Sequence, residues 1–298
     1  MFAKFKRNVR RVRWSGMRRL AMIVVMMLGL GLAKMQAQAS ELPSAQAGGD
    51  PESSTSDSAK AHMLLDAMVK GLGGDAWLHR QDWTYFGRTA TFYKNQPHDE
   101  VPQFEEYYRV NPFGERIILI SHYGIFIATN HKDIAEVFTS DNGYEVTFKG
   151  KKELSAKDVE EYQRRRSHSL ETIVYDWLKQ PGVLVTYEGT NMVERRLADQ
   201  IGILTADNRS VTLELDENTH LPLSISFQWR DPLYKDLNTD VEEFEDYHSV
   251  QGIMTPYSIT RLHNGDMVLQ RFLTKVVYNS GLSPDLFDPD RPLEKKAK

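Results

Sequence analysis

The chain has 298 residues, of which 37 are basic, 41 are acidic and none is cysteine. It can therefore form no disulfide and cannot be lipidated on an N-terminal cysteine. The first 39 residues contain nine basic residues and no acidic one, so their removal would lower the net charge from −4 to about −13. Such an acidic surface repels nucleic acid and anionic bilayers, which argues against both as partners.

Residues 1–39 have the order of a secretory signal peptide. Basic residues come first, an unbroken apolar run follows from Leu20 to Ala33, and a small-residue cleavage site ends at Ala39. The apolar run is shorter than the roughly 20 residues that a membrane-spanning helix needs. We expect cleavage near Ala39 and export to the periplasm, with an uncleaved anchor as the alternative. The start codon is either Met1 or Met17, because Met17 would begin a signal of more ordinary length.

Residues 40–58 are rich in Ser, Ala, Gly, Asp and Pro, which is typical of a disordered linker. The remaining residues, 59–298, are within the size range of one all-β domain. A helix is expected from about Ala59 to Lys70, and the glycines at 71, 73 and 74 end it. Because this glycine-rich stretch follows a helix, a helix cap is favoured over a phosphate-binding loop.

Apolar and polar side chains alternate through much of the chain, which is the period-two pattern of half-buried strands. From Leu221 to Trp229, for example, every odd position is apolar. A sheet of such one-sided strands can close on itself, bury its apolar face under helices, or leave room for an apolar ligand. The expected strands are 83–94, 103–110, 115–121, 125–130, 135–140, 144–149, 183–187, 200–204, 211–215, 221–229, 255–262 and 267–277.

One long helix is predicted from about Ala156 to Lys179. Ser155 is its N-cap, and Pro181-Gly182 ends it. Its C-terminal half has an apolar stripe, whereas its polar N-terminal half is expected to project into water. The basic run Arg164 to Arg166 could bind an anion, but a solvated helix face is favoured.

The sequence contains no nucleophile elbow, zinc-peptidase pair, phosphate-binding loop or dinucleotide fingerprint. His131 and Asp133 are the nearest approach to a ligand pair, and both fall in a predicted turn. Asp285, Asp288 and Asp290 lack the spacing of a calcium loop, so a solvated tail is favoured. We therefore expect no metal, no cofactor and no enzyme activity; a hydrolase assembled from distant strands is the minor alternative.

Several short sequence motifs suggest a family. Thr190 to Glu194 precedes a strand, and Asp216 to Pro222 has the form D-x-x-T-x-L-P. Tyr247 to Pro256 has the form Y-x-x-V-x-G-x-x-x-P, and Leu286-Phe287 lies near the C-terminus. With these motifs the chain resembles the LolA-like superfamily of periplasmic lipoprotein carriers, outer-membrane lipoprotein-sorting proteins with LolB and RseB as relatives.

The resemblance implies a mainly β fold with helices (α+β): a curved antiparallel sheet, or incomplete half-barrel, with helices covering the concave face and an apolar cavity between them. It implies a monomer that binds a lipid or the acyl chain of a lipoprotein. The alternatives are a cavity filled by side chains, and an interaction or sensor module that touches another envelope protein. Alternation and resemblance together predict a cavity lined by Phe104, Tyr108, Val110, Tyr144, Val146, Phe148, Leu213, Leu215, Leu223, Ile225, Phe227 and Trp229, with Leu170, Ile173 and Trp177 as its lid.

Overall fold

A computed structural model of the chain describes residues 51–98, 101–123 and 129–293. The predicted signal peptide, both candidate start codons and most of the predicted linker lie outside these residues. The helix α1 begins at Pro51, so residues 51–58 are helical where the sequence predicts linker.

The described strands form one antiparallel sheet in the order β7-β6-β5-β4-β3-β1-β14-β13-β12-β11-β10-β9-β8, and β2 pairs with β1. Their bounds are β1 Asp82–Tyr93, β2 Gln96–His98, β3 Gln103–Arg109, β4 Gly114–Tyr123, β5 Thr129–Phe138, β6 Gly143–Thr147, β7 Gly150–Glu153, β8 Leu184–Val193, β9 Arg196–Leu204, β10 Ser210–Asp216, β11 Pro222–Arg230, β12 Leu237–Val250, β13 Ile253–His263 and β14 Asp266–Tyr278.

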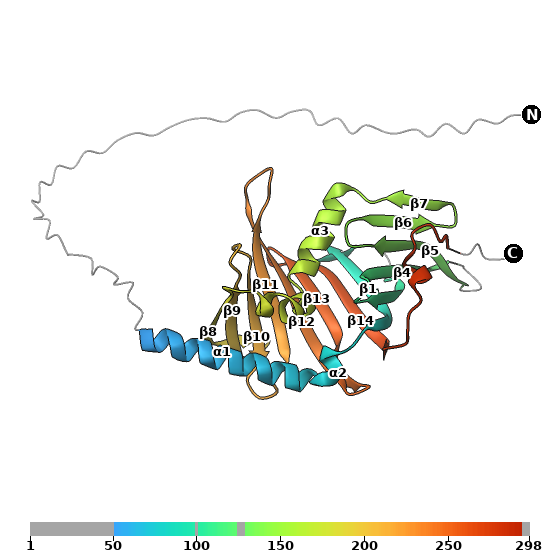
Figure 1. Cartoon of the computed structure of the whole chain (residues 1–298). Coiled ribbons are helices and arrows are strands. Elements are labelled where there is room, and N and C mark those ends of the chain that lie inside the picture. The colour runs from blue at the N-terminus through green and yellow to red at the C-terminus, as the bar shows by residue number, and fades with distance from the viewer. Residues whose placement is uncertain (1–50, 99–100, 124–128, 294–298) are drawn as a thin grey trace, which may run out of the picture. The chain divides into compact units, whose positions relative to one another are not determined.

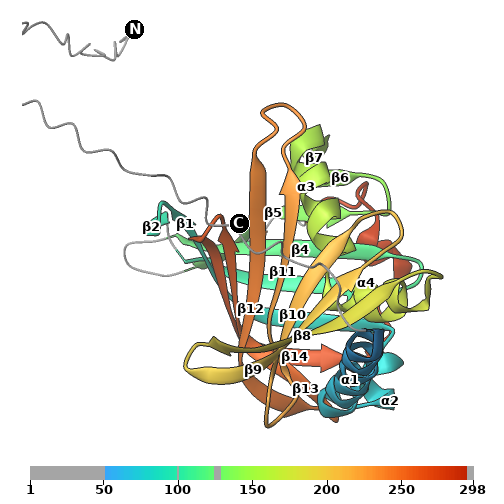
Figure 2. The same cartoon turned by 90° about the vertical axis from the view of Figure 1, so that its left-hand side faces the viewer.

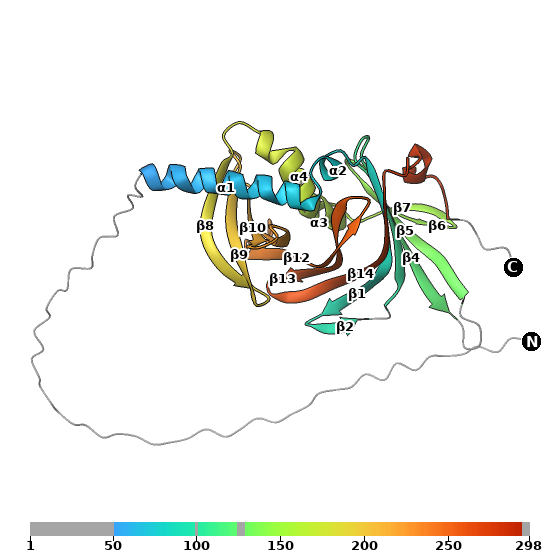
Figure 3. The ribbon, with the colours of Figure 1, turned by 90° about the horizontal axis from the view of Figure 1, so that it is seen from below.

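The sheet is strongly curved but does not close. Most neighbouring strands are also neighbours in the chain; the long-range link is β1 with β14, where Trp83 faces Tyr278. The strands β7 and β8 are the two ends of the described sheet and do not pair with each other. The helices lie within its curve (Figure 3). The fold class predicted above, an incomplete antiparallel half-barrel with helices on its concave face, is confirmed.

The helices are α1 Pro51–Leu72, α2 Asp75–Leu78, α3 Ala156–Ser167 and α4 Leu170–Tyr175, with 3-10 turns at η1 Trp177–Lys179 and η2 Pro284–Phe287. The blue α1 runs along one end of the strands β8–β14, and the green α3 lies toward their other end (Figure 1). Seen from the side, α3, α4 and α1 follow one another along the molecule (Figure 2).

The prediction of a single helix from 156 to 179 is wrong, because the helix is interrupted between α3 and α4. His168 leaves the helical conformation, and Ser169 caps a new helix by accepting a hydrogen bond from the Thr172 N–H at 3.3 Å. The side-chain oxygen of a serine competes with helical backbone bonding and favours such a restart. The two helices can therefore follow the curved sheet in different directions.

The strand predictions missed β2, β7 and β12 and divided β5 in two. Residues 125–128 of one predicted strand lie outside the described residues. The β12 segment is rich in acidic residues and has no continuous apolar face, so alternation of apolar residues could not find it. The turn expected near His131 is part of β5. Pairing with β11 and β13 holds β12 in the sheet despite its composition.

The main hydrophobic cluster lies between α1, α2, α4 and the sheet. Its fully buried members include Met68, Trp77, Ile173, Trp177 and Leu215. A second cluster contains Ile118, Ile120, Ala135, Val137, Val146 and Leu293. Since Ile118 and Ile117 point to opposite faces of β4, and Ile117 lines the cavity described below, this second cluster covers the other face of the sheet.

Candidate ligand-binding cavity

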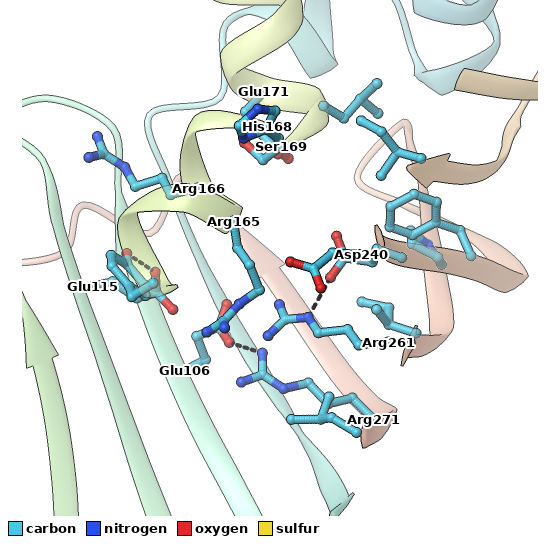
Figure 4. Close-up of a pocket in the computed structure, with 18 of the residues that line it drawn as sticks. Glu106, Glu115, Arg165, Arg166, His168, Ser169, Glu171, Asp240, Arg261 and Arg271 are labelled. Carbon is cyan, nitrogen blue, oxygen red and sulfur yellow. Dashed lines mark hydrogen bonds and ion pairs between the residues drawn. The ribbon is translucent and has the colours of Figure 1, made fainter. Parts of the chain in front are cut away.

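A cavity of about 760 Å³ lies between α3, α4 and the concave face of the sheet. Its lining comes from β1, β3, β4, β5 and β11–β14, together with the helices that cover them. Small-molecule sites in proteins occupy about 300–1,000 Å³, so this space is large enough for a ligand. Figure 4 shows its charged part, with α3 on one side and the strands on the other.

One part of the lining is apolar. Side chains from the sheet and from the helices α1, α2 and α4 contribute to it. Arg80 stands at the border of this part, with its guanidinium 4.3 Å from the Trp77 ring centre and 4.8 Å from that of Trp83. The apolar lining includes Leu72, Trp77, Trp83, Leu170, Ile225, Phe227, Phe244, Met254, Ile259 and Leu273.

The other part of the lining carries ion pairs. Arg271 of β14 pairs with Glu106 of β3 at 2.5 Å, and both side chains are nearly buried. Arg261 of β13 pairs with Glu242 of β12 at 2.8 Å. These charged side chains occupy positions of the sheet that alternation would give to apolar residues. In half-buried strands the polar side chains ordinarily face solvent, and this part of the sheet departs from that pattern.

The arginines of α3 also face the cavity. The Arg164 guanidinium lies 3.5 Å from the Trp229 ring centre, and its Nε is 4.0 Å from a carboxylate oxygen of Asp240. Arg165 pairs with Glu161 one turn earlier on the helix. The prediction that this half of the helix projects into water holds for its first residues, since 156–158, 160 and 161 are exposed. It is wrong for Arg164 to Arg166, which are only partly exposed and line the cavity.

Tyr162 fixes α3 to the sheet. Its ring stacks on Phe138 with the two centres 3.7 Å apart, and its hydroxyl donates a 2.5 Å hydrogen bond to Glu115. Stacking of this kind contributes about 0.5–1.5 kcal/mol beyond the burial of area. The sequence evidence for this contact is that Tyr162 is the one aromatic residue in the very polar segment 156–167.

Glu115 holds a proton unusually well. Burial, and then the neighbouring negative charge of Glu106, raise the pKa of the Glu115 carboxyl to about 7, although the hydrogen bond from Tyr162 acts in the opposite direction. Burial also raises the pKa of Glu136, against the influence of Arg271. The cavity therefore carries less negative charge near neutral pH than its count of carboxyl groups suggests.

His168 joins the two helices to the cavity wall. Its ring stacks on Phe227 with centres 4.1 Å apart, and its Nδ1 lies 2.7 Å from the carbonyl oxygen of Arg164. Burial lowers the pKa of His168. A neutral imidazole suits this position, where Nδ1–H donates to the carbonyl oxygen and the ring packs on an aromatic neighbour.

The predicted cavity residues divide into several groups. Tyr108, Ile225, Phe227 and Trp229 line the cavity, and so does Leu170 of the predicted lid. The others lie elsewhere. Phe104, Leu213, Leu215, Ile173 and Trp177 are buried in the main cluster, Val110 packs against it, Leu223 is buried outside it, Tyr144 and Val146 belong to the second cluster, and Phe148 is exposed.

The reason for this division is geometric. Alternation tells which residues of a strand share a face, but it does not tell which face is concave. In β6 the apolar face containing Tyr144 and Val146 packs on the second cluster, against β5. The charged lining was missed for a related reason. Glu106 lies between Phe104 and Tyr108 on a face that is otherwise apolar, and this charged residue in an apolar pattern was the sequence evidence for a charged lining.

No metal centre is evident in the part of the chain that the structure describes, since no group of three or more His, Asp or Glu side chains there could hold an ion. The side chains of His131 and Asp133 lie outside the description. In the tail, Asp290 pairs with Lys151 at 2.8 Å.

Of the described helices, none combines the length and the apolar character that crossing a membrane would require.

No family model and no curated protein matches the chain. Similar solved structures include a domain assigned to the outer membrane lipoprotein-sorting proteins of Vibrio parahaemolyticus, with 11% identity, a TM-score of 0.49, and coverage of 79% of this chain and 100% of that chain. A LolA superfamily protein from Nitrosomonas europaea has 11% identity and a TM-score of 0.45, over 76% of this chain and 97% of the other. A DUF1329 family protein from Desulfovibrio piger has 11% identity and a TM-score of 0.46, with the same coverage of 76% and 97%. One of these descriptions names the LolA superfamily and another names lipoprotein-sorting proteins. The likeness, with TM-scores below 0.5, assigns no ligand to this chain.

Proposed function

We propose that this chain is a cell-envelope protein that binds a lipid or an acylated cargo in the cavity beneath α3. The observation that carries the proposal is the division of one cavity into an apolar part, around Leu170 and Phe244, and a charged part, around Arg261 and Arg271. An amphiphile has the same division between its chain and its head. Holding it needs no catalytic group.

The energetics favour such a ligand. Burial of each methylene contributes about 0.8 kcal/mol, so a chain of ~14 methylenes offers roughly 11 kcal/mol before ordering costs are subtracted. The aromatic residues Trp77, Trp83 and Phe244 offer the acyl chain of the ligand a preformed apolar surface. A rigid, preformed surface keeps those ordering costs low.

The site of action follows from the predicted signal peptide, residues 1–39. We place the chain, cleaved near Ala39, in the periplasm as a monomer, where its cargo would be the acyl part of a lipid or of a lipoprotein bound for the outer membrane. The second candidate is an interaction or sensor module of the same fold that contacts another envelope protein and has no cargo.

A cavity-filling substitution tests the proposal. Leu269 lines the cavity, so Leu269→Trp should reduce uptake of a fluorescent fatty acid at least ten-fold. Leu197 lies on β9 outside the cavity and is exposed, so Leu197→Trp is the matched control and should bind like the unmodified chain. Native mass spectrometry of protein purified from its own periplasm should reveal a bound mass that delipidation removes.

Identical masses before and after delipidation, with no uptake of the fluorescent fatty acid by the unmodified chain, would contradict the proposal. That result would favour the interaction or sensor module.

A further inference from the structure

Arginines converge on one region of the cavity from two sides. Arg164, Arg165 and Arg166 come from α3, and Arg261 and Arg271 come from the sheet. Figure 4 shows the Arg165 side chain extending from the helix toward Arg261 and Arg271. Like charges that lie close together repel each other, and such a cluster is stable where anions compensate its charge.

The carboxylates of the cavity lie within ion-pair distance of four of these five arginines. Glu242 and Glu106 pair with the two arginines of the sheet, and Glu161 pairs with Arg165. Asp240 lies 4.0 Å from Arg164 but accepts hydrogen bonds from the Trp229 Nε1–H at 2.9 Å and from His263 at 2.6 Å. Within the described residues Arg166 has no carboxylate within ion-pair distance; its guanidinium lies over the Phe113 ring instead.

Three guanidinium N–H groups of the cavity lining lack an acceptor among the described residues; one belongs to Arg80, and two belong to this cluster. The Nε atoms of Arg164 and Arg271 are both buried and both lack a hydrogen-bond partner among the described residues. A buried donor without an acceptor costs about 1–3 kcal/mol, and more when it is charged. An oxyanion in the cavity could accept hydrogen bonds from such groups, since guanidinium groups match carboxylate and phosphate oxygens in geometry.

The titration of nearby groups agrees with this geometry. Burial, and then the charge of Arg261, lower the pKa of Arg165, so the Arg165 cation is destabilised at this position. Glu115 carries only part of its negative charge near neutral pH, because its pKa is raised to about 7 by burial and by Glu106. Both effects favour a further negative charge beside Arg165.

We propose that the charged part of the cavity is an oxyanion site, in which the arginines of α3 together with Arg261 and Arg271 bind the carboxylate or phosphate head of an amphiphile. This inference rests on the proposed function and narrows its ligand to anionic amphiphiles. The apolar chain of the ligand lies against Leu170, Phe244 and Leu273. The head enters the arginine cluster and α3 covers it.

The test compares probes that share a twelve-carbon chain and differ in the head: dodecanoate, dodecyl phosphate, dodecyl maltoside and dodecyltrimethylammonium. Each is titrated into the full chain below its critical micelle concentration. The two anionic probes should bind at least ten-fold more tightly than the neutral and cationic ones. A preference for dodecanoate indicates a fatty-acid carboxylate, and a preference for dodecyl phosphate indicates a phosphate head.

Variants of the arginines separate the head site from the chain site. Arg165→Gln together with Arg166→Gln should weaken binding of the anionic probes at least ten-fold and leave the neutral probe unchanged, which also shows that the variant is folded. The pair of changes to Lys should restore part of the affinity. Arg88 is exposed on β1 and does not line the cavity, so Arg88→Gln is the control and should have no effect.

Equal affinity for all four heads, or an equal loss of all four in the glutamine variant, would overturn the oxyanion site while leaving amphiphile binding intact. Failure of the unmodified chain to bind any of the probes would overturn both the site and the proposed function.

Discussion

The concave face of the sheet is covered in two different ways. Under α1 and α4 it is filled by apolar side chains such as Leu213, Trp177 and Met68, which are completely buried. Under α3 and the start of α4 it is hollow, and charged residues line one part of that cavity. One sheet thus supports a packed core and a cavity side by side.

The sequences of the two helices explain the difference. Ile173 and Val174 of α4 are buried and fill the space beneath that helix. In α3 only Tyr162 is buried, and long charged side chains follow it. Long charged side chains need polar partners at their ends, so they do not pack to the density of a hydrocarbon core. A polar helix above a sheet therefore preserves a volume that an apolar helix would fill.

The sharpest test of this comparison is to make the same truncation in both regions. Leu213→Ala removes a fully buried side chain from the packed region and should cost about 2–5 kcal/mol in the free energy of unfolding. Leu269→Ala, on the wall of the cavity, leaves no new closed void and should cost about 1 kcal/mol. Urea denaturation of both variants measures these costs, and equal losses would contradict the division into packed and hollow regions.

The second test uses pH. The folded-state pKa of Glu115 is raised to about 7 by burial and by Glu106, above the unfolded value near 4.5, so the folded state binds the proton more tightly. The contribution of Glu115 to stability is therefore fully present below about pH 4.5 and is lost as the pH rises to about 7. The loss amounts to roughly 3 kcal/mol, at 1.36 kcal/mol for each pKa unit.

Glu115→Gln mimics the protonated carboxyl and should abolish this decline, which makes the variant more stable than the unmodified chain at pH 8. Chemical denaturation at several pH values provides the measurement. Glu217 is exposed, and Glu217→Gln is the control that should keep the original slope. The same slope in Glu115→Gln as in the unmodified chain would show that Glu115 is not the group responsible.

The smallest expected effect concerns the helix caps. Ser155 caps α3 by accepting a hydrogen bond from the Asp158 N–H at 3.2 Å, and Ser155→Ala should cost about 1 kcal/mol. Since α3 covers the cavity, its amides should then exchange hydrogen faster, while those of α1 in the packed region keep their rates. Hydrogen-exchange mass spectrometry measures both, with Ser155→Thr as the variant that retains the cap. Faster exchange throughout α1 as well would show that the two regions are not independent.

Much of the fold was predictable from local patterns. Alternation located the strands from β8 to β11, the hairpin of β13 and β14, and most of β1 and β3. It failed where charge replaces apolar residues on an inward face, as in β12. It also failed between α3 and α4, where a continuous helical pattern hides the Ser169 cap.

The candidate site was predictable only in part, for the same reason. Tyr108, Ile225, Phe227 and Trp229 belong to the expected apolar face and line the cavity. The residues that give the cavity its charge come from β3, β4, β12, β13, β14 and α3. Each of these residues, taken alone in the sequence, resembles any charged surface residue. They form a site only because the fold brings them together.

By itself the sequence determined a one-sided antiparallel meander with covering helices, because the spacing of apolar residues along one strand or helix already decides which side is buried. Only the tertiary structure decided which face is concave, which helix fills it and which leaves it open. Those outcomes depend on pairings between distant residues, such as Glu106 with Arg271 and Glu115 with Tyr162, which are 165 and 47 positions apart in the chain. No local pattern records a contact at that separation.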